Sequence, residues 1–488
     1  MKAITRRSVM TGAIVAAPAS GLFGCSKPAA APTPSDPLVV DDQSRLNATR
    51  VSRNVTVGTG PSDAATGLRE QILAATAIGK PLCIGGARHS MGGQSLPPSR
   101  GFAATLAPGP SRVHGDARTY SVPAGARWRD VIRQLDPHGL SPAVTQSNND
   151  FSIGGALSVN AHGWAVPFGP IGSTVQAFRL MLADGSIASC SPNENSELFG
   201  LCLGGYGLMG IVLDADLASV PNVQLERTQI RLDANDFAVR FQQAVHTPDV
   251  RMAYGRLSLH NSAFLKEAIL VTHRPSVDPP ATLPPARSSS TAEGLSRALF
   301  RGQTGSDAGK RRRWWAETRL TPRLADLSTR NSLMNVPVRS FAGSDLGRTD
   351  ILHEYFVPPA VLNEFLGECR RLIRASDQDL LNVTLRWIEA DRQSVMSFAP
   401  DARIALVMLF SQVISDAAES DMRDLTRRLI DAALAAGGSF YLPYRLHARP
   451  DQIRRAYPEM EAFLAAKRRW DPGLRFRNQM WDTCFAGL

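Results

Sequence analysis

Two glycine-rich loops, each with a single histidine, are the residues of this 488-residue sequence whose types and spacing point most clearly to chemistry. The first follows a short apolar run and contains Gly85, Gly86, Ala87, Arg88, His89, Ser90 and Gln94. The second contains Ser152, Gly154, Gly155, Asn160, His162 and Gly163. Glycine lets a ligand approach the backbone closely, and a concave run of N–H groups binds phosphate oxygens. We therefore expect both loops to hold a large phosphate-bearing cofactor.

Short strands and a few helices must position these loops. We expect strands at 82–84, 119–122, 175–182 and 187–190, and helices at 67–76 and 128–135. The turn at 183–186 predicts a hairpin between the last two strands. This pattern indicates an α+β fold. A dinucleotide fold is not expected, because no Gly-x-Gly-x-x-Gly motif closes a strand with an acidic residue about 20 positions later.

Four motifs occur in an order that resembles the FAD-binding domain of the vanillyl-alcohol oxidase family, the PCMH-type domain. They lie at 84–90, at 122–128, in the two parts 152–155 and 160–163, and at 203–212. The resemblance covers roughly residues 51–222, and four ordered motifs are more specific than one glycine loop. It implies a two-part FAD-binding domain with an α+β substrate (cap) domain. It also implies that Gly210 and Ile211 meet the adenine end of FAD.

The two loop histidines take different roles in this interpretation. In many family members the histidine of the first loop is bonded to the flavin 8α-methyl group, and His89 stands at that place. A neutral imidazole nitrogen is a competent nucleophile, so a covalent bond is expected; the alternative is a hydrogen-bonded histidine. For His162 the resemblance implies a contact with the flavin ring, against the alternative of a buried structural histidine. It is not expected to be the catalytic base.

The cap domain supplies the residues expected to face the substrate. Its clearest predicted strands are 352–357, 381–388 and 404–410, and alternation places Asn382, Thr384 and Arg386 on one face. Sugar-lactone and alditol oxidases of the family carry Glu-x-Arg on what looks like the same strand. Here Thr384-Leu385-Arg386 keeps the arginine and lacks the carboxylate.

Arg386 could stabilise negative charge on the reduced flavin or hold a substrate oxygen; the alternative is a salt bridge at the domain interface. Two groups could supply the missing base. They are Glu354 and a tyrosine cluster that consists of Tyr441, Tyr444 and Arg445, and either could instead be ordinary packing.

The final segment, 470–480, resembles the Asp-Pro-x-x-x-Phe-x-Asn ending of aldonolactone oxidases, which act on D-arabinono-1,4-lactone or L-gulonolactone. We therefore expect an FAD-dependent oxidoreductase that oxidises a primary or secondary alcohol of an aldonolactone or alditol. Hydride would pass to flavin N5 and the electrons to O2 or another acceptor. Enzymes resembling cytokinin dehydrogenase or decaprenyl-phosphoryl-ribose oxidase are alternatives within this class. A non-catalytic binding lipoprotein on the same fold is the alternative outside it.

The N-terminus indicates export. A twin-arginine motif at 5–10 precedes an apolar run at 12–23 that is too short to span a bilayer. Leu-Phe-Gly before Cys25 resembles a lipobox, which predicts lipid attachment at Cys25 and a signal peptide at 1–24; the alternative is a plain cleaved signal. Residues 25–50 are expected to be a flexible tether, because large apolar residues are scarce there. The mature protein would then be anchored on the periplasmic side of the envelope.

The remaining chain is long enough for two cores, and we expect an FAD domain at 51–222, a cap at 223–450 and a segment at 451–488 that returns to the FAD domain. The net charge is +10, yet the densest basic run, 310–315, lies in no nucleic-acid fold signature. No nucleic-acid partner is therefore expected. The five cysteines after Cys25 show no C-x-x-C spacing, so we expect neither a disulfide framework nor a metal site.

Overall fold

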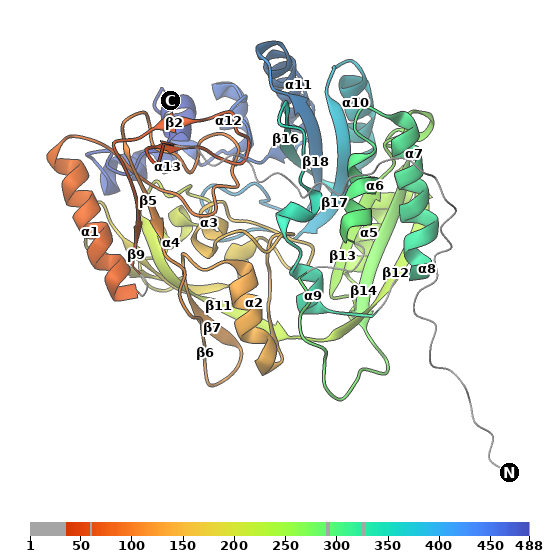
Figure 1. Cartoon of the computed structure of the whole chain (residues 1–488), viewed down its shortest axis with the longest axis horizontal. Coiled ribbons are helices and arrows are strands. Elements are labelled where there is room, and N and C mark those ends of the chain that lie inside the picture. The colour runs from red at the N-terminus through yellow and green to blue at the C-terminus, as the bar shows by residue number, and fades with distance from the viewer. Residues whose placement is uncertain (1–35, 59–60, 289–292, 325–326, 488) are drawn as a thin grey trace.

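The computed structural model describes residues 36–58, 61–288, 293–324 and 327–487, and every structural statement below concerns these residues (Figure 1). The expected signal peptide, Cys25 and the start of the expected tether lie outside them. The fold is α+β, as the sequence predicted.

The first part of the chain builds two sheets. A parallel sheet has the order β3-β5-β4, formed by β3 (Arg53–Val57), β5 (Phe102–Leu106) and β4 (Leu82–Ile84). An antiparallel sheet has the order β10-β9-β11-β7-β6, with β8 also paired to β11. Its strands are β10 (Ile187–Cys190), β9 (Val175–Met181), β11 (Ile211–Pro221), β7 (Thr119–Pro123), β6 (Arg112–Val113) and β8 (Leu140–Pro142). The expected hairpin at 175–190 is therefore confirmed by the β9–β10 pair.

Helices of this part fix where the two glycine loops lie. Helix α1 (Pro61–Ala77) packs on the parallel sheet, and α2 (Trp128–Leu135) buries its apolar residues, which recur at helical spacing. The first loop leaves the end of β4. The second surrounds α3 (Ile153–Ser158), whose first turn is capped by Ser152: its Oγ accepts from the N–H of Gly155 at 3.3 Å.

The cap is one antiparallel sheet with the order β15-β12-β14-β13-β17-β18-β16-β19. Its strands are β15 (Ser328–Thr329), β12 (Gln224–Asp233), β14 (Glu267–Pro275), β13 (Met252–Leu257), β17 (Asp379–Ile388), β18 (Arg403–Val413), β16 (Arg348–Val357) and β19 (Ser439–Phe440). The three expected cap strands are confirmed, each extended by one to four residues at an end.

Three helices cover one face of the cap sheet; part of the other face lines the flavin side, and α7 (Asp307–Trp315) packs on the rest of it through Arg313 and Trp314. The three helices are α5 (Phe237–Val245), α10 (Leu362–Arg374) and α11 (Asp416–Ala435) (Figure 1). On β16, Tyr355 contacts Phe365 of α10 with ring centroids 5.8 Å apart, so its neighbour Glu354 faces the opposite way. The remaining helices are α4 (Ser196–Cys202), α6 (Glu293–Arg301), α8 (Thr321–Leu324), α9 (Arg330–Met334), α12 (Pro450–Ala456) and α13 (Met460–Trp470).

The expectation of a flexible tether up to residue 50 is wrong for residues 36–50. Strands β1 (Val39–Val40) and β2 (Thr49–Arg50) pair there, and Asp42 and Ser44 are buried. The carboxylate of Asp42 accepts from the N–H of Gly93 at 2.8 Å. The polar composition was misleading because the Asp42 side chain binds the end of the first glycine loop and Ser44 binds Asp42, whereas the polar side chains of a flexible tether stay in water.

The end of the chain lies against the first part of the fold. The N–H of Leu82 donates to the carbonyl of Arg475 at 2.7 Å, and the side chain of Asn478 donates to the carbonyls of Gln94 and Tyr206 at 2.9 and 3.1 Å. The 470–480 segment thereby buttresses the first glycine loop. In the described residues the five cysteines are buried and free, and none of the helices is long and apolar enough to cross a membrane.

Candidate active site

A cavity of about 1740 Å³ is lined on one side by the two glycine loops and on the other by the open face of the cap sheet. The sequence-predicted cofactor residues that line it are Gly85, Gly86, Ala87, Arg88, His89, Ser90, Gln94, Ser152, Gly154, Gly155, His162, Gly210 and Ile211. The predicted catalytic residues Glu354, Thr384, Arg386 and Tyr444 line it too. Residues far apart in the sequence thus share one enclosed space.

Two predicted cofactor residues, Asn160 and Gly163, lie outside the cavity lining and contact other parts of the protein. The side-chain amide of Asn160 donates to Asp391 at 2.9 Å and accepts from the N–H of Gly172 at 2.9 Å. Gly163 packs against Thr145, whose carbonyl oxygen would lie 2.1 Å from a Cβ at this position. Both residues hold the shape of the second loop, and the sequence could not separate that role from contact with a ligand.

The first loop presents free backbone amides to the cavity. The N–H groups of Gly86, Arg88, His89 and Ser90 make no hydrogen bond in the described part of the chain. Arg88 has φ of +55°, a left-handed conformation that helps to turn successive amides toward one side. A Cβ at Gly86 would lie 2.0 Å from Oγ of Ser152, so the two loops lie too close together for a side chain at residue 86. This cradle suits the diphosphate of FAD.

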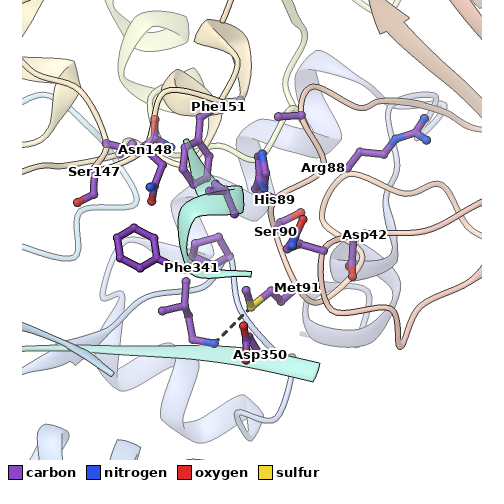
Figure 2. A pocket seen from close by; sticks show the side chains of 18 of the residues that line it. Asp42, Arg88, His89, Ser90, Met91, Ser147, Asn148, Phe151, Phe341 and Asp350 are labelled. Atoms are coloured by element: carbon purple, nitrogen blue, oxygen red, sulfur yellow. Dashed lines mark hydrogen bonds between the residues drawn. The ribbon is translucent and has the colours of Figure 1, made fainter. Parts of the chain in front are cut away.

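His89 lies at the edge of the cavity beside Phe151, with ring centroids 4.5 Å apart (Figure 2). Burial lowers the pKa of His89 to about 4, an effect that the carboxylate of Asp150 only partly opposes. The imidazole is therefore neutral at pH 7. A neutral ring has a free lone pair, which a nucleophile requires.

A buried carboxylate–histidine contact joins the second loop to the cap sheet. Nε2 of His162 lies 2.6 Å from Oε1 of Glu354, and each side chain is 2% exposed. The hydroxyl of Tyr444 donates to the other carboxylate oxygen at 3.0 Å. Burial opposes ionisation of Glu354, but His162, Arg386 and the Tyr444 hydroxyl together lower its pKa below the usual value. Glu354 is therefore held as a carboxylate.

Arg386 completes this end of the cavity. Its guanidinium donates to Oγ of Ser147 at 2.6 Å and to the carbonyl of His162 at 3.4 Å, and its Nε has no partner among the described residues. Burial lowers the pKa of Arg386, and Glu354 counters this effect. The alternative of an interface salt bridge is not observed for Arg386 within the described residues, because its direct partners are a hydroxyl and a carbonyl.

The sheet register places four side chains in one row across the open face. Arg256 of β13 pairs with Thr384, Thr384 with Val407, and Val407 with Glu354. The hydroxyl of Thr384 accepts from the side chain of Asn382 at 2.9 Å. The carboxylate that the 384–386 motif lacks is thus present two strands away.

Sequence reasoning missed part of the cavity lining, including Arg256 and Ser147, and one contact between the second glycine loop and the cap. Arg256 and Ser147 line the cavity, and neither was expected there. The alternation of Tyr254 and Arg256 along a strand could have indicated that Arg256 faces the cavity. No local sequence pattern predicts the contact between Glu354 and His162. The predicted tyrosine cluster divides: Tyr444 contacts Glu354, whereas the hydroxyl of Tyr441 donates to the carbonyl of Val159 at 2.7 Å.

Comparison with known proteins agrees with this geometry. Residues 66–191, which include both glycine loops, match the family described as FAD binding domain. Cytokinin dehydrogenase 4 of Oryza sativa subsp. japonica is 34% identical over 128 residues, covering 26% of this chain and 24% of that protein. D-arabinono-1,4-lactone oxidase of Yarrowia lipolytica is 32% identical over 109 residues, covering 22% and 21%. Alditol oxidase of a Streptomyces species is 29% identical over 160 residues, covering 32% and 38%.

The matches to these three relatives cover between 22% and 32% of this chain. The chain spans between 21% and 38% of the length of these three relatives. Residues 66–191 match an FAD-binding domain of the PCMH type, which agrees with three of the four motifs of the resemblance; the fourth, at 203–212, lies beyond the matched residues. Among the residues that the structure describes, no cluster of histidine, cysteine, aspartate or glutamate could hold a metal ion.

Proposed function

We propose that this protein is an FAD-dependent oxidoreductase that oxidises a primary or secondary alcohol of a sugar-like substrate. The observation that carries the proposal is the His162–Glu354 pair, which lies beside Arg386 in the cavity lined by the FAD-binding loops. The flavin, when bound, supplies a two-electron acceptor at N5 for a hydride from carbon. Oxidation of an alcohol also requires a base for the hydroxyl proton, and the cap sheet provides one.

The chain's own residues take three roles in this proposal. Glu354 is held as a carboxylate with Oε1 2.6 Å from Nε2 of His162, and it accepts the hydroxyl proton of the substrate. The guanidinium of Arg386 stabilises negative charge that develops during oxidation. Thr384 lies in the same cross-strand row as Glu354 and binds a substrate hydroxyl.

The substrate class is supported by the polar wall and by the relatives. Carbohydrates present many hydroxyl groups, and the open face carries matching donors and acceptors at Arg256, Asn382, Thr384 and Arg386. Relatives that match part of this chain include proteins named alditol oxidase and D-arabinono-1,4-lactone oxidase. We therefore favour an aldonolactone or alditol. A cytokinin is the second candidate, because another relative is named cytokinin dehydrogenase.

Attachment of the flavin through His89 is part of the proposal. The ring lines the cavity and is neutral at pH 7, so a nitrogen lone pair is available for a bond to the flavin 8α-methyl group. We also propose twin-arginine export and lipid attachment at Cys25, on the sequence pattern alone. Replacing Cys25 by serine is expected to release the protein from the membrane fraction, which fractionation and immunoblotting would measure.

The decisive experiment is anaerobic reduction of the protein-bound flavin. Purified protein would be mixed without oxygen with aldonolactones, alditols and cytokinins, and bleaching of the flavin absorbance would be followed. Reduction by an aldonolactone or alditol is expected. Admission of oxygen, with peroxide and dye reduction recorded separately, then identifies the acceptor. A stable flavin that none of these compounds reduces would overturn the proposed function and favour a non-catalytic binding protein.

A further inference from the structure

The end of the cavity opposite the His162–Glu354 pair is rich in arginine. Helix α6, the 3-10 helix at Val338–Phe341, the start of β16 and the segment between β1 and β2 bring these side chains to the cavity lining: Arg45, Arg297, Arg301, Arg339 and Arg348. Figure 2 shows Phe341 and Asp350 of this region facing the loop that carries His89. We refer to the five arginines as the arginine end.

The acidic residues of this region are already engaged. Asp350 accepts from Arg301 at 2.9 Å, Asp345 accepts from the N–H of Gly347 at 2.8 Å, and Asp42 accepts from the N–H of Gly93 at 2.8 Å. Only the first of these three contacts pairs an aspartate with an arginine of the cavity lining. The arginine end therefore keeps an excess of positive charge.

Four of the five arginines have no carboxylate partner in the described part of the protein. Arg348 donates from Nε and one Nη to the hydroxyl and carbonyl of Ser411 at 2.9 and 2.7 Å, and Arg45 donates to the backbone carbonyls of Leu346 and Arg348. The side chains of Arg297 and Arg339 have no hydrogen-bond or ion-pair partner among the described residues. Guanidinium groups carry five N–H donors in a rigid fork that matches carboxylate and phosphate oxygens, so Arg297 and Arg339 are free to bind an anion, and Arg45 and Arg348 keep N–H donors that these contacts do not use.

The arginine end and the proposed proton acceptor share one face of β16. Arg348 and Glu354 are six residues apart on this strand, which corresponds to about 20 Å at roughly 3.3 Å per residue. Alternation places both on the cavity face. The cavity of about 1740 Å³ exceeds the roughly 300–1,000 Å³ typical of a single ligand site, so it has room beside a cofactor.

We propose that the arginine end is a second subsite, which binds a phosphate or carboxylate group of an extended substrate whose alcohol reaches Glu354. This inference rests on the proposed function and narrows it to anionic sugar derivatives. The competing ligand within the same cavity is the diphosphate of FAD. The free N–H groups of residues 86 and 88–90 can bind that diphosphate, so the arginines on the cap side remain for the substrate.

Binding of matched probes to the flavin-loaded protein tests this subsite. Isothermal titration calorimetry would compare glucose 6-phosphate with glucose, and trigalacturonate with maltotriose. Wild type is expected to bind at least one anionic probe about tenfold or more tightly than its neutral partner, since a hydrogen bond to a charged group contributes roughly 1.5–3 kcal/mol. The pair of probes with the larger difference in affinity shows whether the subsite prefers a phosphate or a carboxylate.

The variant for this test is Arg297→Gln/Arg339→Gln, whose two residues are half-buried and exposed, so no buried partner is left unpaired. It is expected to lose the preference for the anion while keeping its flavin content and its affinity for the neutral probe. Arg112→Gln, on β6 outside the cavity lining, is the matched control and should keep the preference.

Three results would overturn the subsite. They are equal affinity for anionic and neutral probes in wild type, retention of the preference in the double variant, or loss of flavin from that variant, which would assign the arginines to the cofactor. If the protein binds the anionic probe but no aldonolactone, alditol or cytokinin reduces its flavin, the subsite is supported and the proposed function is overturned. The two proposals therefore fail separately.

Discussion

Nε2 of His162 lies 2.6 Å from Oε1 of Glu354, and this contact joins the loop after α3 to the central part of β16. It places an ionised carboxylate in the cavity where the Thr384-Leu385-Arg386 motif lacks one. The cap sheet thereby supplies acid–base chemistry from β16, which lies two strands away from β17. This arrangement predicts how substitutions at individual residues change the reaction rate, flavin binding or stability, and each effect can be measured.

Replacing Glu354 by glutamine is expected to lower kcat by about 10²- to 10⁴-fold, the usual contribution of a general base. Glutamine keeps the shape and one acceptor oxygen, so flavin content should not change. Stopped-flow flavin reduction would measure the rate, and flavin absorbance the content.

Glu419→Gln is the matched control for that variant. Glu419 also forms a carboxylate–histidine contact, 2.9 Å from Nε2 of His447, but neither residue lines the cavity. We expect this variant to lose stability and to keep its rate of flavin reduction. Equal rate losses in both variants would contradict a catalytic role for Glu354.

The His89→Ala protein is expected to release its flavin on acid precipitation, whereas wild type should keep the flavin in the pellet. The expectation follows from the neutral imidazole of His89 at the cavity edge. Absorbance of pellet and supernatant gives the result. Release from wild type would show a non-covalent flavin, and retention by the variant would place the bond elsewhere.

Gly86→Ala is expected to abolish FAD binding, because its Cβ would lie 2.0 Å from Oγ of Ser152, the cap of α3. The ratio of flavin to protein absorbance would measure the loss. Gly115→Ala is the control, since a Cβ there meets nothing within 4 Å. Combining Gly86→Ala with Ser152→Gly removes the clash and should recover part of the flavin. Full flavin content in Gly86→Ala would show that the two loops separate easily.

Stability is expected to fall as the pH is lowered from about 6.5 toward 3, in part because of His353. Burial lowers its pKa to about 3, while an unfolded chain protonates histidine near pH 6.5. In that window the unfolded state binds the extra proton, so the free energy of unfolding falls by up to about 1.4 kcal/mol per pH unit for this group. Urea unfolding at pH 7, 6 and 5 would measure the slope. His353→Asn should lower this slope by up to about 1.4 kcal/mol per pH unit, which is the contribution of one proton. An unchanged slope would contradict the assignment of the effect to His353.

Local sequence pattern determined much of the FAD-binding part. The ranges of β4, β10 and α2 follow from apolar periodicity and turn residues, which act over a few neighbouring positions. The glycine loops were recognisable because close backbone approach to a ligand allows few residue types. The alternation of Asn382, Thr384 and Arg386 likewise predicted a polar strand face, which β17 shows.

Only the tertiary structure decided which of these residues meet. Composition placed Asp42 and Ser44 in a flexible tether, but their hydrogen bonds pack that segment into the fold, Asp42 directly against Gly93. Motif position assigned Asn160 to the cofactor, whereas its amide binds Asp391 and the N–H of Gly172.

The sequence by itself therefore determined the cofactor-binding loops, the α+β class and the faces of individual strands, because those depend on short-range sterics and periodicity. The tertiary structure alone decided that Glu354 meets His162 and that five arginines gather at the far end of the cavity. Such contacts depend on strand order and register across the cap sheet. These are set by packing between segments distant in the chain, and no local pattern encodes them.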